Sequence, residues 1–363
     1  MFYQLFYPLR ELFFGFNVFK YITFRAAMAS ITAFLLSIFF GPWLISKLSQ
    51  LKIGENIIDS KVQPALHSLH RQKRGLPTMG GLLILFSTVF STLLWARIDN
   101  KYLLLALFSI LWLGGIGFID DYMKYTGRCS QGMTVPAKLL GQSILAVIVG
   151  LFAFYDPQIG QRLDIPFLKD LIVNLGYIYI VFVVLVIVGS SNAVNLTDGL
   201  DGLATGCVVT VALTYGIFSY VSGHARISSY LQVNYVPGSG ELTVFCASIV
   251  GAALGFLWFN AYPAEVLMGD TGSLALGGAI GVVAVLIKKE LLLLLAGGIF
   301  VAECLSVILQ VASFKLRGKR IFLVAPLHHH FQLRGLSESK VTIRFWIVAV
   351  ILAFSALATL KLR

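Results

Sequence analysis

Five polar clusters interrupt an otherwise apolar sequence, and three of them contain aspartates whose spacing suggests chemistry. Asp120 and Asp121 are neighbours, Asp198 and Asp201 stand three positions apart, and Asp270 precedes a Thr-Gly-Ser turn. Carboxylate oxygens are the ligands that a hard divalent cation prefers, and Mg²⁺ is usually held by one or two of them together with phosphates and waters. The clusters are KRGLPTMGG (73–81), IDDYMK (119–124), NAVNLTDGLDG (192–202), NAYPAEVLMGDTGS (260–273) and PLHHH (326–330).

The elements that must position these residues are membrane-spanning helices. The chain is 58% hydrophobic and only 12% charged, whereas about a quarter of the residues of a soluble protein are charged. A bilayer core about 30 Å thick needs about 20 apolar residues per helix, and apolar runs of this length without period-two alternation exclude a β-barrel. We therefore expect an all-α polytopic membrane protein with one integral membrane domain over 1–363. About ten transmembrane helices are expected, at 20–46, 78–97, 102–120, 136–155, 171–190, 199–221, 241–260, 266–287, 290–314 and 342–361.

Each polar cluster follows an odd-numbered span, so parity places all five on one face of the membrane. The connections on that face hold more Lys and Arg than the others, which favours a cytoplasmic location for the clusters and periplasmic termini. Residues 1–18 are aromatic and are expected to form a periplasmic interfacial segment. The connection 222–240 is expected to contain a short pair of strands. The net charge of +11 suits anionic headgroups or a polyanionic substrate, and nothing indicates nucleic acid.

Ionisable residues at an apolar boundary are costly unless they are paired or bind a ligand, so the aspartates indicate function. Any one of these aspartates, taken alone, is as compatible with a helix cap as with a functional role. Five of them on one face are hard to explain as caps. Asp120 and Asp121 would point about 100° apart on a helix, which predicts separate tasks. In contrast, Glu303 lies within the apolar run GGIFVAECLSVILQ, and we expect it to form a structural hydrogen bond away from the motif face.

Basic residues and histidines accompany the aspartates on the expected face. Lys73 and Lys138 lie near Gly-rich or small-residue turns where a diphosphate could bind, whereas Arg74 fits an exposed loop better. The histidines of PLHHH have no Cys/His spacing typical of a zinc site, and contact with a phosphate or a nucleobase is the favoured interpretation. Together these residues predict phosphoryl chemistry on a diphosphate, with a lipid as the other reactant.

The five motifs, in this order on a frame of ten spans, resemble those of the phospho-N-acetylmuramoyl-pentapeptide transferase family. NAVNLTDGLDGLA is typical of the wider polyprenyl-phosphate hexose-1-phosphate transferase superfamily, and PLHHH is typical of this branch. The resemblance extends over essentially the whole chain. It implies transfer of phospho-MurNAc-pentapeptide from UDP-MurNAc-pentapeptide to undecaprenyl phosphate, giving lipid I and UMP with Mg²⁺ as cofactor. It also implies a homodimer among the lipids of the bacterial inner membrane, with its active site on the cytoplasmic face.

Transferred residue by residue, the resemblance implies that Asp120, Asp121 and Asp270 are catalytic and that Asp270 is a metal ligand. Leu76 and Leu267 depart from the family pattern, the latter at a position where an aromatic side chain often stands, and Gln332 replaces a frequent Glu. The implied substrate-binding residues are Lys73, Thr78, Lys138, Asn192, Asn195, Asp198, Asp201, Asn260, His328, His329 and His330.

Two mechanisms and two other functions stay open at this point. The lipid phosphate could attack the sugar-bearing phosphate directly, with Asp120 orienting or deprotonating it, or a carboxylate could first form a covalent phospho-sugar intermediate. A related transferase could move GlcNAc-1-phosphate, although the three histidines argue against it. A secondary transporter also has many spans and few acidic residues, but transporters place them near the bilayer midplane rather than at one edge.

Overall fold

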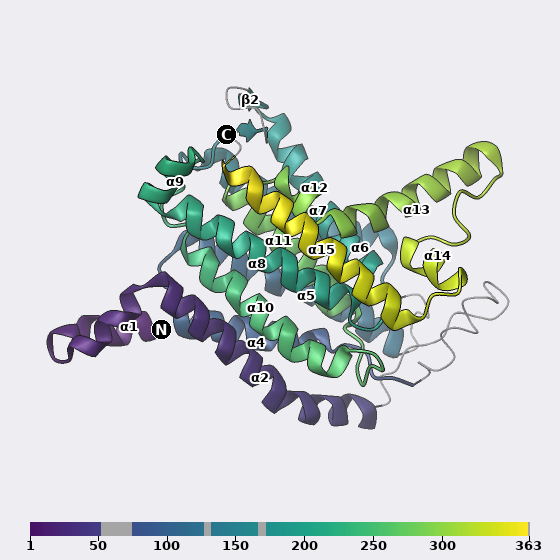
Figure 1. Ribbon diagram of the computed structural model, residues 1–363, viewed down its shortest axis with the longest axis horizontal. Coiled ribbons are helices and arrows are strands. Elements are labelled where there is room, and N and C mark those ends of the chain that lie inside the picture. Colours follow the sequence, from purple (N-terminus) through teal and green to yellow (C-terminus); the bar gives the residue numbers. More distant parts are fainter. Residues whose placement is uncertain (52–74, 127–131, 166–171, 362–363) are drawn as a thin grey trace.

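Apolar helices dominate the computed structural model, which describes residues 1–51, 75–126, 132–165 and 172–361 (Figure 1). Nine helices in the described ranges are long and apolar enough to cross a membrane, and α4 is a shorter apolar helix of 15 residues. The chain is therefore a multi-pass helical membrane protein, as expected. The ten apolar helices are α2 (Ile22–Gln50), α4 (Gly81–Trp95), α5 (Lys101–Tyr125), α6 (Val135–Tyr155), α7 (Ile178–Thr197), α8 (Leu203–Gly223), α10 (Glu241–Asn260), α11 (Gly269–Leu286), α13 (Gly298–Arg317) and α15 (Glu338–Ala358).

Most of these helices agree with the expected spans to within a few residues, but three local predictions are wrong. The expected span 290–314 is not continuous, because a short helix α12 (Leu292–Ala296) ends at Gly297 before α13 begins. The connection 222–240 contains helix α9 (Ala225–Leu231) instead of a strand pair. The described strand pair lies before α7, where β1 (Arg162–Asp164) pairs antiparallel with β2 (Ile172–Asn174), so α7 starts at residue 178 and not at 171.

Helix α11 lies at the centre of the bundle and packs against α4, α5, α7 and α8. Small residues where these helices meet α11 allow the backbones to approach closely, as is common between helices in membranes. A Cβ atom on Gly117 of α5 would lie 2.2 Å from the carbonyl oxygen of Asp270, and one on Gly81 of α4 would lie 2.1 Å from the backbone nitrogen of Gly272. The backbones of α4, α5 and α11 therefore meet at the end of the bundle that contains the aspartates.

Both termini lie at the opposite end of the bundle. The Met1 amino group donates to the carbonyl oxygen of Leu93, near the end of α4, at 2.8 Å. The Lys361 ammonium group lies 3.9 Å from the ring centroid of Tyr230, in α9. The helices α1 (Phe2–Phe6), η1 (Pro8–Glu11) and η2 (Phe14–Lys20) form an aromatic N-terminal segment that projects from the bundle (Figure 1).

The C-terminal part of the chain forms an arm and returns. Only the first half of α13 has buried residues, and its second half extends away from the bundle (Figure 1). Gln310 then accepts the backbone N–H groups of Ile321 and Phe322, each at 3.0 Å, and so folds the chain back onto α13. This return leads into the short helix α14 (Leu327–Leu333), which contains the three histidines, and then into α15 and the final turn η4 (Thr359–Lys361).

Candidate active site

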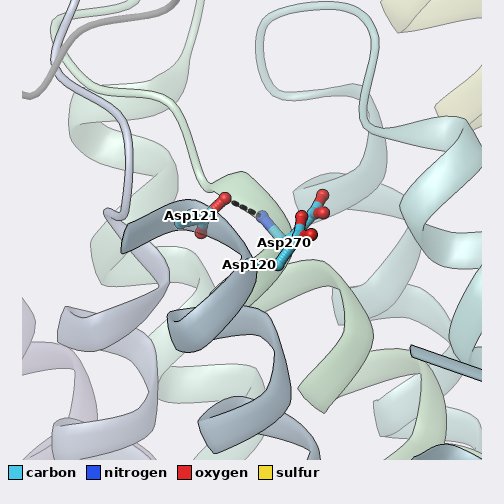
Figure 2. Close-up of side chains that lie close together, drawn as sticks. All are labelled: Asp120, Asp121 and Asp270. Atoms are coloured by element: carbon cyan, nitrogen blue, oxygen red, sulfur yellow. Dashed lines mark hydrogen bonds between the residues drawn. The ribbon is translucent and has the colours of Figure 1, made fainter. Parts of the chain in front are cut away.

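Three aspartates from two helices meet where α5 ends and α11 begins. One carboxylate oxygen each from Asp120, Asp121 and Asp270 lies within 4.8 Å of the other two. Asp120 and Asp121 are only 2% and 4% exposed. Figure 2 shows the carboxylates of Asp120 and Asp270 side by side, whereas Asp121 points to the other side of α5. The sequence-based prediction that distant carboxylates gather on one face is confirmed for these three residues, and so is the divergence of the two neighbours.

Asp121 caps the first turn of α11. Its carboxylate accepts the backbone N–H of Asp270 at 3.2 Å and that of Thr271 at 2.9 Å, and the Thr271 hydroxyl donates to it at 2.7 Å. A negative charge at a helix N-terminus is stabilised by the unpaired N–H groups and by the helix dipole. Both oxygens of Asp121 are therefore engaged, and the residue fixes α11, together with Asp270, against α5.

Two lysines neutralise the other two carboxylates. The Lys124 ammonium group lies 2.6 Å from Asp120 Oδ2 and 3.0 Å from Asp270 Oδ2. The Lys138 ammonium group lies 2.7 Å from Asp270 Oδ2 and 3.8 Å from Asp120 Oδ2. The second Asp120 oxygen accepts the Met133 backbone N–H at 2.7 Å. Buried carboxylates need such partners, and the arrangement leaves two cations beside the acidic pair.

Lys124 was not among the residues expected in the site. It stands four positions after Asp120, and residues with this spacing are neighbours on a helix surface, so the i, i+4 pattern within IDDYMK was the available indication.

The polar face of α7 supplies the next contacts. Asn195 donates to Asp270 Oδ1 at 2.6 Å and to Ser273 Oγ at 2.9 Å. Asn192, one turn earlier, donates to Gln142 Oε1 at 2.7 Å and thereby joins α7 to α6. The helix ends at Thr197 with Asp198 as its C-cap, so Asp198 and Asp201 do not continue the helix face that carries Asn192 and Asn195.

Asp201 and Asn260 hold the turn that follows α7. Asp201 Oδ2 accepts the Ala264 backbone N–H at 3.0 Å. Asn260 Oδ1 accepts the Gly202 backbone N–H at 3.1 Å and the Thr205 hydroxyl at 2.9 Å. Asp201 and Asn260 are both buried, and these bonds hold the turn that joins α7 to α8 in place.

Glu338 of α15 is a further residue that the sequence did not indicate. It accepts the backbone N–H of Asp201 at 2.8 Å.

The KRGLPTMGG motif is only partly described. Lys73, an expected substrate-binding residue, lies outside the described residues. Thr78 lies beside the aspartates, because a Cβ atom on Gly269 would lie 2.9 Å from Thr78 Oγ1 and 2.8 Å from Asp121 Oδ2. Backbone bonds from Leu267 N–H to Pro77 and from Gly80 N–H to Leu267 hold this segment along the approach to α11.

The three histidines have different surroundings. His328 is 1% exposed and packs its ring against Gly199. His329 is half-buried, and its Nδ1 lies 3.0 Å from Gln332 Oε1. His330 Nδ1 accepts the Leu323 backbone N–H at 3.1 Å. Burial, together with the Arg334 cation, lowers the pKa of His330 below its ordinary value, which agrees with a neutral, accepting ring.

The expectation that Glu303 lies away from the motifs is wrong. Its carboxylate accepts the backbone N–H of His328 at 3.2 Å, and its Oε2 lies 3.2 Å from the Nδ1 of the same residue.

The donor set of the aspartate cluster fits a hard divalent cation, because it consists of carboxylate oxygens that already converge. Asp121 is the least available of the three, since its oxygens accept the hydrogen bonds from α11. Asp270, the metal ligand that the resemblance implies, would hold the ion, and Asp120 lies beside it (Figure 2). Basic side chains beside such a centre suit a phosphate-bearing ligand.

Comparison with known proteins shows the family. Residues 103–288, which cover all of α7 and α11 and all but the first two residues of α5, match the model of glycosyl transferase family 4. The chain is 53% identical over 364 residues to the phospho-N-acetylmuramoyl-pentapeptide-transferase of Desulfotalea psychrophila, and 52% identical over 363 residues to that of Citrifermentans bemidjiense, with all of each chain covered. It is 54% identical to that of Methylacidiphilum infernorum over 96% of both chains. The chain therefore belongs to the phospho-N-acetylmuramoyl-pentapeptide-transferase family, within glycosyl transferase family 4.

Proposed function

We propose that this chain transfers phospho-MurNAc-pentapeptide from UDP-MurNAc-pentapeptide to undecaprenyl phosphate and so produces lipid I and UMP. The main support is the meeting of Asp120 and Asp270 with two lysine ammonium groups at the ends of membrane-spanning helices. The full-length similarity to relatives that bear the name of this enzyme supports the same activity.

In the proposed step, an oxygen of the lipid phosphate attacks the phosphorus that bears the sugar. A new P–O bond forms, and the bond from that phosphorus to the oxygen that bridges to the uridine-bearing phosphate breaks. UMP leaves with the electron pair of that bond. The Lys124 and Lys138 ammonium groups stabilise the negative charge that develops on the phosphate oxygens, and such electrostatic stabilisation is the main contribution expected in phosphoryl transfer.

Direct attack is favoured because a lipid phosphate is already an anionic nucleophile. Asp120 then orients the acceptor or removes its remaining proton, and Asp270 is held for ligand binding by Asn195. The alternative is a covalent phospho-sugar on a carboxylate. Incubation with radiolabelled UDP-sugar in the absence of lipid distinguishes the two mechanisms. A covalent label on the wild-type protein that does not form on Asp120→Asn would establish the covalent route.

Mg²⁺ is the ion that we propose for the cluster, and Asp270 would hold it. When bound, it supplies positive charge that neutralises the diphosphate. Asn195 fixes the second oxygen of Asp270, so that residue presents its carboxylate in one orientation.

An apolar groove of about 290 Å³ fits the polyprenyl chain of the acceptor. It runs between α7, α11, α12 and α13, and its lining includes Ala193 and Val194. These residues directly precede Asn195, whose amide contacts Asp270. A lipid tail in this groove would therefore have its phosphate close to the aspartates, because the two sites are adjacent along α7.

The proposed orientation places the aspartates at the cytoplasmic face of the bacterial inner membrane and both termini in the periplasm. The excess of Lys and Arg in the connections at the aspartate end supports this orientation. Residues 1–18 then lie at the periplasmic interface, where the exposed Leu12 and Phe14 contact lipid. We also propose that the enzyme acts as a homodimer.

The test of the function is UMP release by the purified chain from UDP-MurNAc-pentapeptide and undecaprenyl phosphate, with and without Mg²⁺. Release that needs both the lipid and the ion is expected. UDP-GlcNAc in place of the first substrate is the matched control, and preferential release from UDP-GlcNAc would support the related GlcNAc-1-phosphate transfer instead. Solute counter-flow in liposomes without any lipid product would support a transporter.

A further inference from the structure

Glu303 is buried in α13 without being part of the aspartate cluster. It is 0% exposed, and an acidic side chain in an apolar helix is costly unless a partner compensates for the lost water. Its partner is the first histidine of α14. Glu303 Oε1 accepts the His328 backbone N–H at 3.2 Å, and Oε2 lies 3.2 Å from the His328 ring nitrogen Nδ1.

This contact joins α14 to the buried half of α13, and α14 also packs against α15 through the rings of Phe331 and Phe345. Gln310 binds the returning chain through Ile321 and Phe322, and the Ser313 hydroxyl donates to the Lys319 carbonyl at 2.9 Å. These bonds tie the return to the outer half of α13, which extends away from the bundle (Figure 1). In the described part of the chain, Glu303 is the residue of the buried half of α13 that hydrogen-bonds to α14.

His328 in turn contacts the turn that follows α7. A Cβ atom on Gly199 would lie 2.3 Å from His328 Nε2, so the ring packs directly against the backbone of that glycine. Gly199 lies between Asp198 and Asp201 in the NLTDGLDG motif. The sequence of contacts thus runs from α13 through Glu303 and His328 to a motif that is expected to bind the donor.

We propose that Glu303 is a positioning residue for the donor site, which it holds by fixing His328, and with it α14, against the turn at Gly199. The proposal rests on the proposed function, and it adds that the histidine tract and the NLTDGLDG motif, which the family resemblance implies bind substrate, bind the UDP-sugar. Glu303 itself contacts His328 and is not assigned a contact with substrate.

The kinetic test compares Glu303→Leu with Glu303→Gln. Leucine keeps an apolar helix but removes both contacts, whereas glutamine keeps an oxygen that can accept the His328 N–H. Because the contact orients a binding surface remote from the reacting phosphorus, its loss should raise KM and leave kcat nearly unchanged. We expect about a tenfold rise in KM for UDP-MurNAc-pentapeptide in Glu303→Leu, no change in KM for undecaprenyl phosphate, and recovery to within about threefold in Glu303→Gln.

Ser306→Ala is the matched control. Ser306 is also buried in α13, but its hydroxyl donates within the helix, to the Glu303 carbonyl oxygen at 2.7 Å. Ser306→Ala should leave both KM values unchanged. A merely structural role for Glu303 would instead lower the active fraction in Glu303→Leu with both KM values retained, and that outcome would overturn the proposal.

A double-mutant cycle tests whether Glu303 acts through His328. Residues that act through one contact have non-additive effects. His328→Ala removes the ring but keeps the backbone N–H that Glu303 Oε1 accepts. In that background, Glu303→Leu should therefore raise the donor KM by only about threefold instead of about tenfold. An undiminished tenfold effect in that background would contradict the proposed route.

Amide hydrogen exchange provides a readout that does not depend on turnover. Faster exchange is expected over 327–333 in Glu303→Leu but not in Glu303→Gln or Ser306→Ala. If wild type and Ser306→Ala both fail to release UMP, the proposed function fails while the exchange data still decide the role of Glu303. If they release UMP but exchange over 327–333 is unchanged in Glu303→Leu, the positioning role is wrong and the proposed function stands.

Discussion

Asp121, in the last turn of α5, accepts the backbone N–H of Asp270 at 3.2 Å and so fixes the start of α11 at the centre of the bundle. The neighbouring carboxylate of Asp120 faces a different set of groups, which are the Lys124 ammonium and the Met133 N–H. One aspartate of the pair thus stabilises the site, and the other is available for chemistry.

This division predicts different effects of two isosteric substitutions. Asp121→Asn removes a charged cap from α11 and should lower the stability by about 1 kcal/mol. Asp120→Asn removes the ion pair with Lys124 but also the repulsion from the Asp270 carboxylate, so it should lower the stability less. It should reduce lipid I formation by about a thousandfold, since it removes the group proposed to act on the acceptor. Thermal unfolding in detergent, measured beside the activity, checks both. Equal loss of stability in the two variants would contradict the division.

Removal of either lysine should weaken catalysis. A charge-assisted hydrogen bond contributes about 1.5–3 kcal/mol, so Lys138→Gln should lower kcat/KM for the UDP-sugar by about ten- to a hundredfold. Lys124→Gln should have a similar effect, because its ammonium contacts the same Asp270 oxygen. Lys101→Gln is the control, since Lys101 pairs with Asp156 away from the cluster. Steady-state kinetics on the three variants checks this prediction. An equal loss of activity in all three variants, the control included, would show it to be wrong.

The approach of α5 to α11 depends on Gly117. A Cβ atom there would lie 2.2 Å from the Asp270 carbonyl oxygen, so Gly117→Ala must separate the two helices. We expect a loss of about 2 kcal/mol in stability and a large loss of activity, as for other overpacked cores. Gly115→Ala, on the same helix, meets no atom within 4 Å and should be neutral. An active, stable Gly117→Ala would contradict the packing described for this end of the bundle.

Filling the apolar groove should affect only the lipid substrate. Gly189 lines the groove, and a Cβ atom there would meet no atom within 4 Å, so Gly189→Phe directs a large side chain into the groove. We expect a higher KM for undecaprenyl phosphate, a smaller effect on a short-chain polyprenyl phosphate, and an unchanged KM for the UDP-sugar. Gly115→Phe places the same side chain in the lipid-facing groove between α4 and α5 and is the control. Equal effects of both variants would argue against the proposed acceptor groove.

The packing of α14 should depend on pH through His330. Its folded pKa lies below the ordinary value of 6.5, first because of burial and then because of Arg334. The contribution of the neutral ring is therefore complete above pH 6.5 and is lost as the pH falls below 6.5 toward the folded pKa. Protection factors over 327–333 should decrease between about pH 7 and about pH 5. His330→Asn should abolish this decrease, and an identical decrease in that variant would assign it to another group.

The gathering of Asp120, Asp121 and Asp270 could be predicted from the sequence because a bilayer restricts the possible arrangements. Each apolar run of about 20 residues must cross the membrane. Parity alone therefore places the C-terminal end of α5 and the start of α11 on the same face of the membrane. The residues that bond within a single helix, such as Asp120 and Lys124, could have been paired by their i, i+4 spacing.

Other features depend on contacts that spacing does not encode. The interruption at Gly297 lies inside an apolar run, where the length of the run alone predicts one continuous helix. Glu303 was misplaced because its partner His328 is brought back by the fold of the arm around Gln310, which has no periodic signature. The bonds from Asp201 to Ala264 and from Asn260 to Gly202 join residues about 60 positions apart and could not be read from spacing.

The most direct test of the account is the rate of lipid I formation in liposomes by wild type, Asp120→Asn and Asp270→Asn, with Gly115→Ala as the control. If the two carboxylates act on one diphosphate, the rate of lipid I formation should fall by about a thousandfold in each Asn variant, while the control keeps the wild-type rate. A wild-type rate in either Asn variant would contradict a shared site at the ends of α5 and α11.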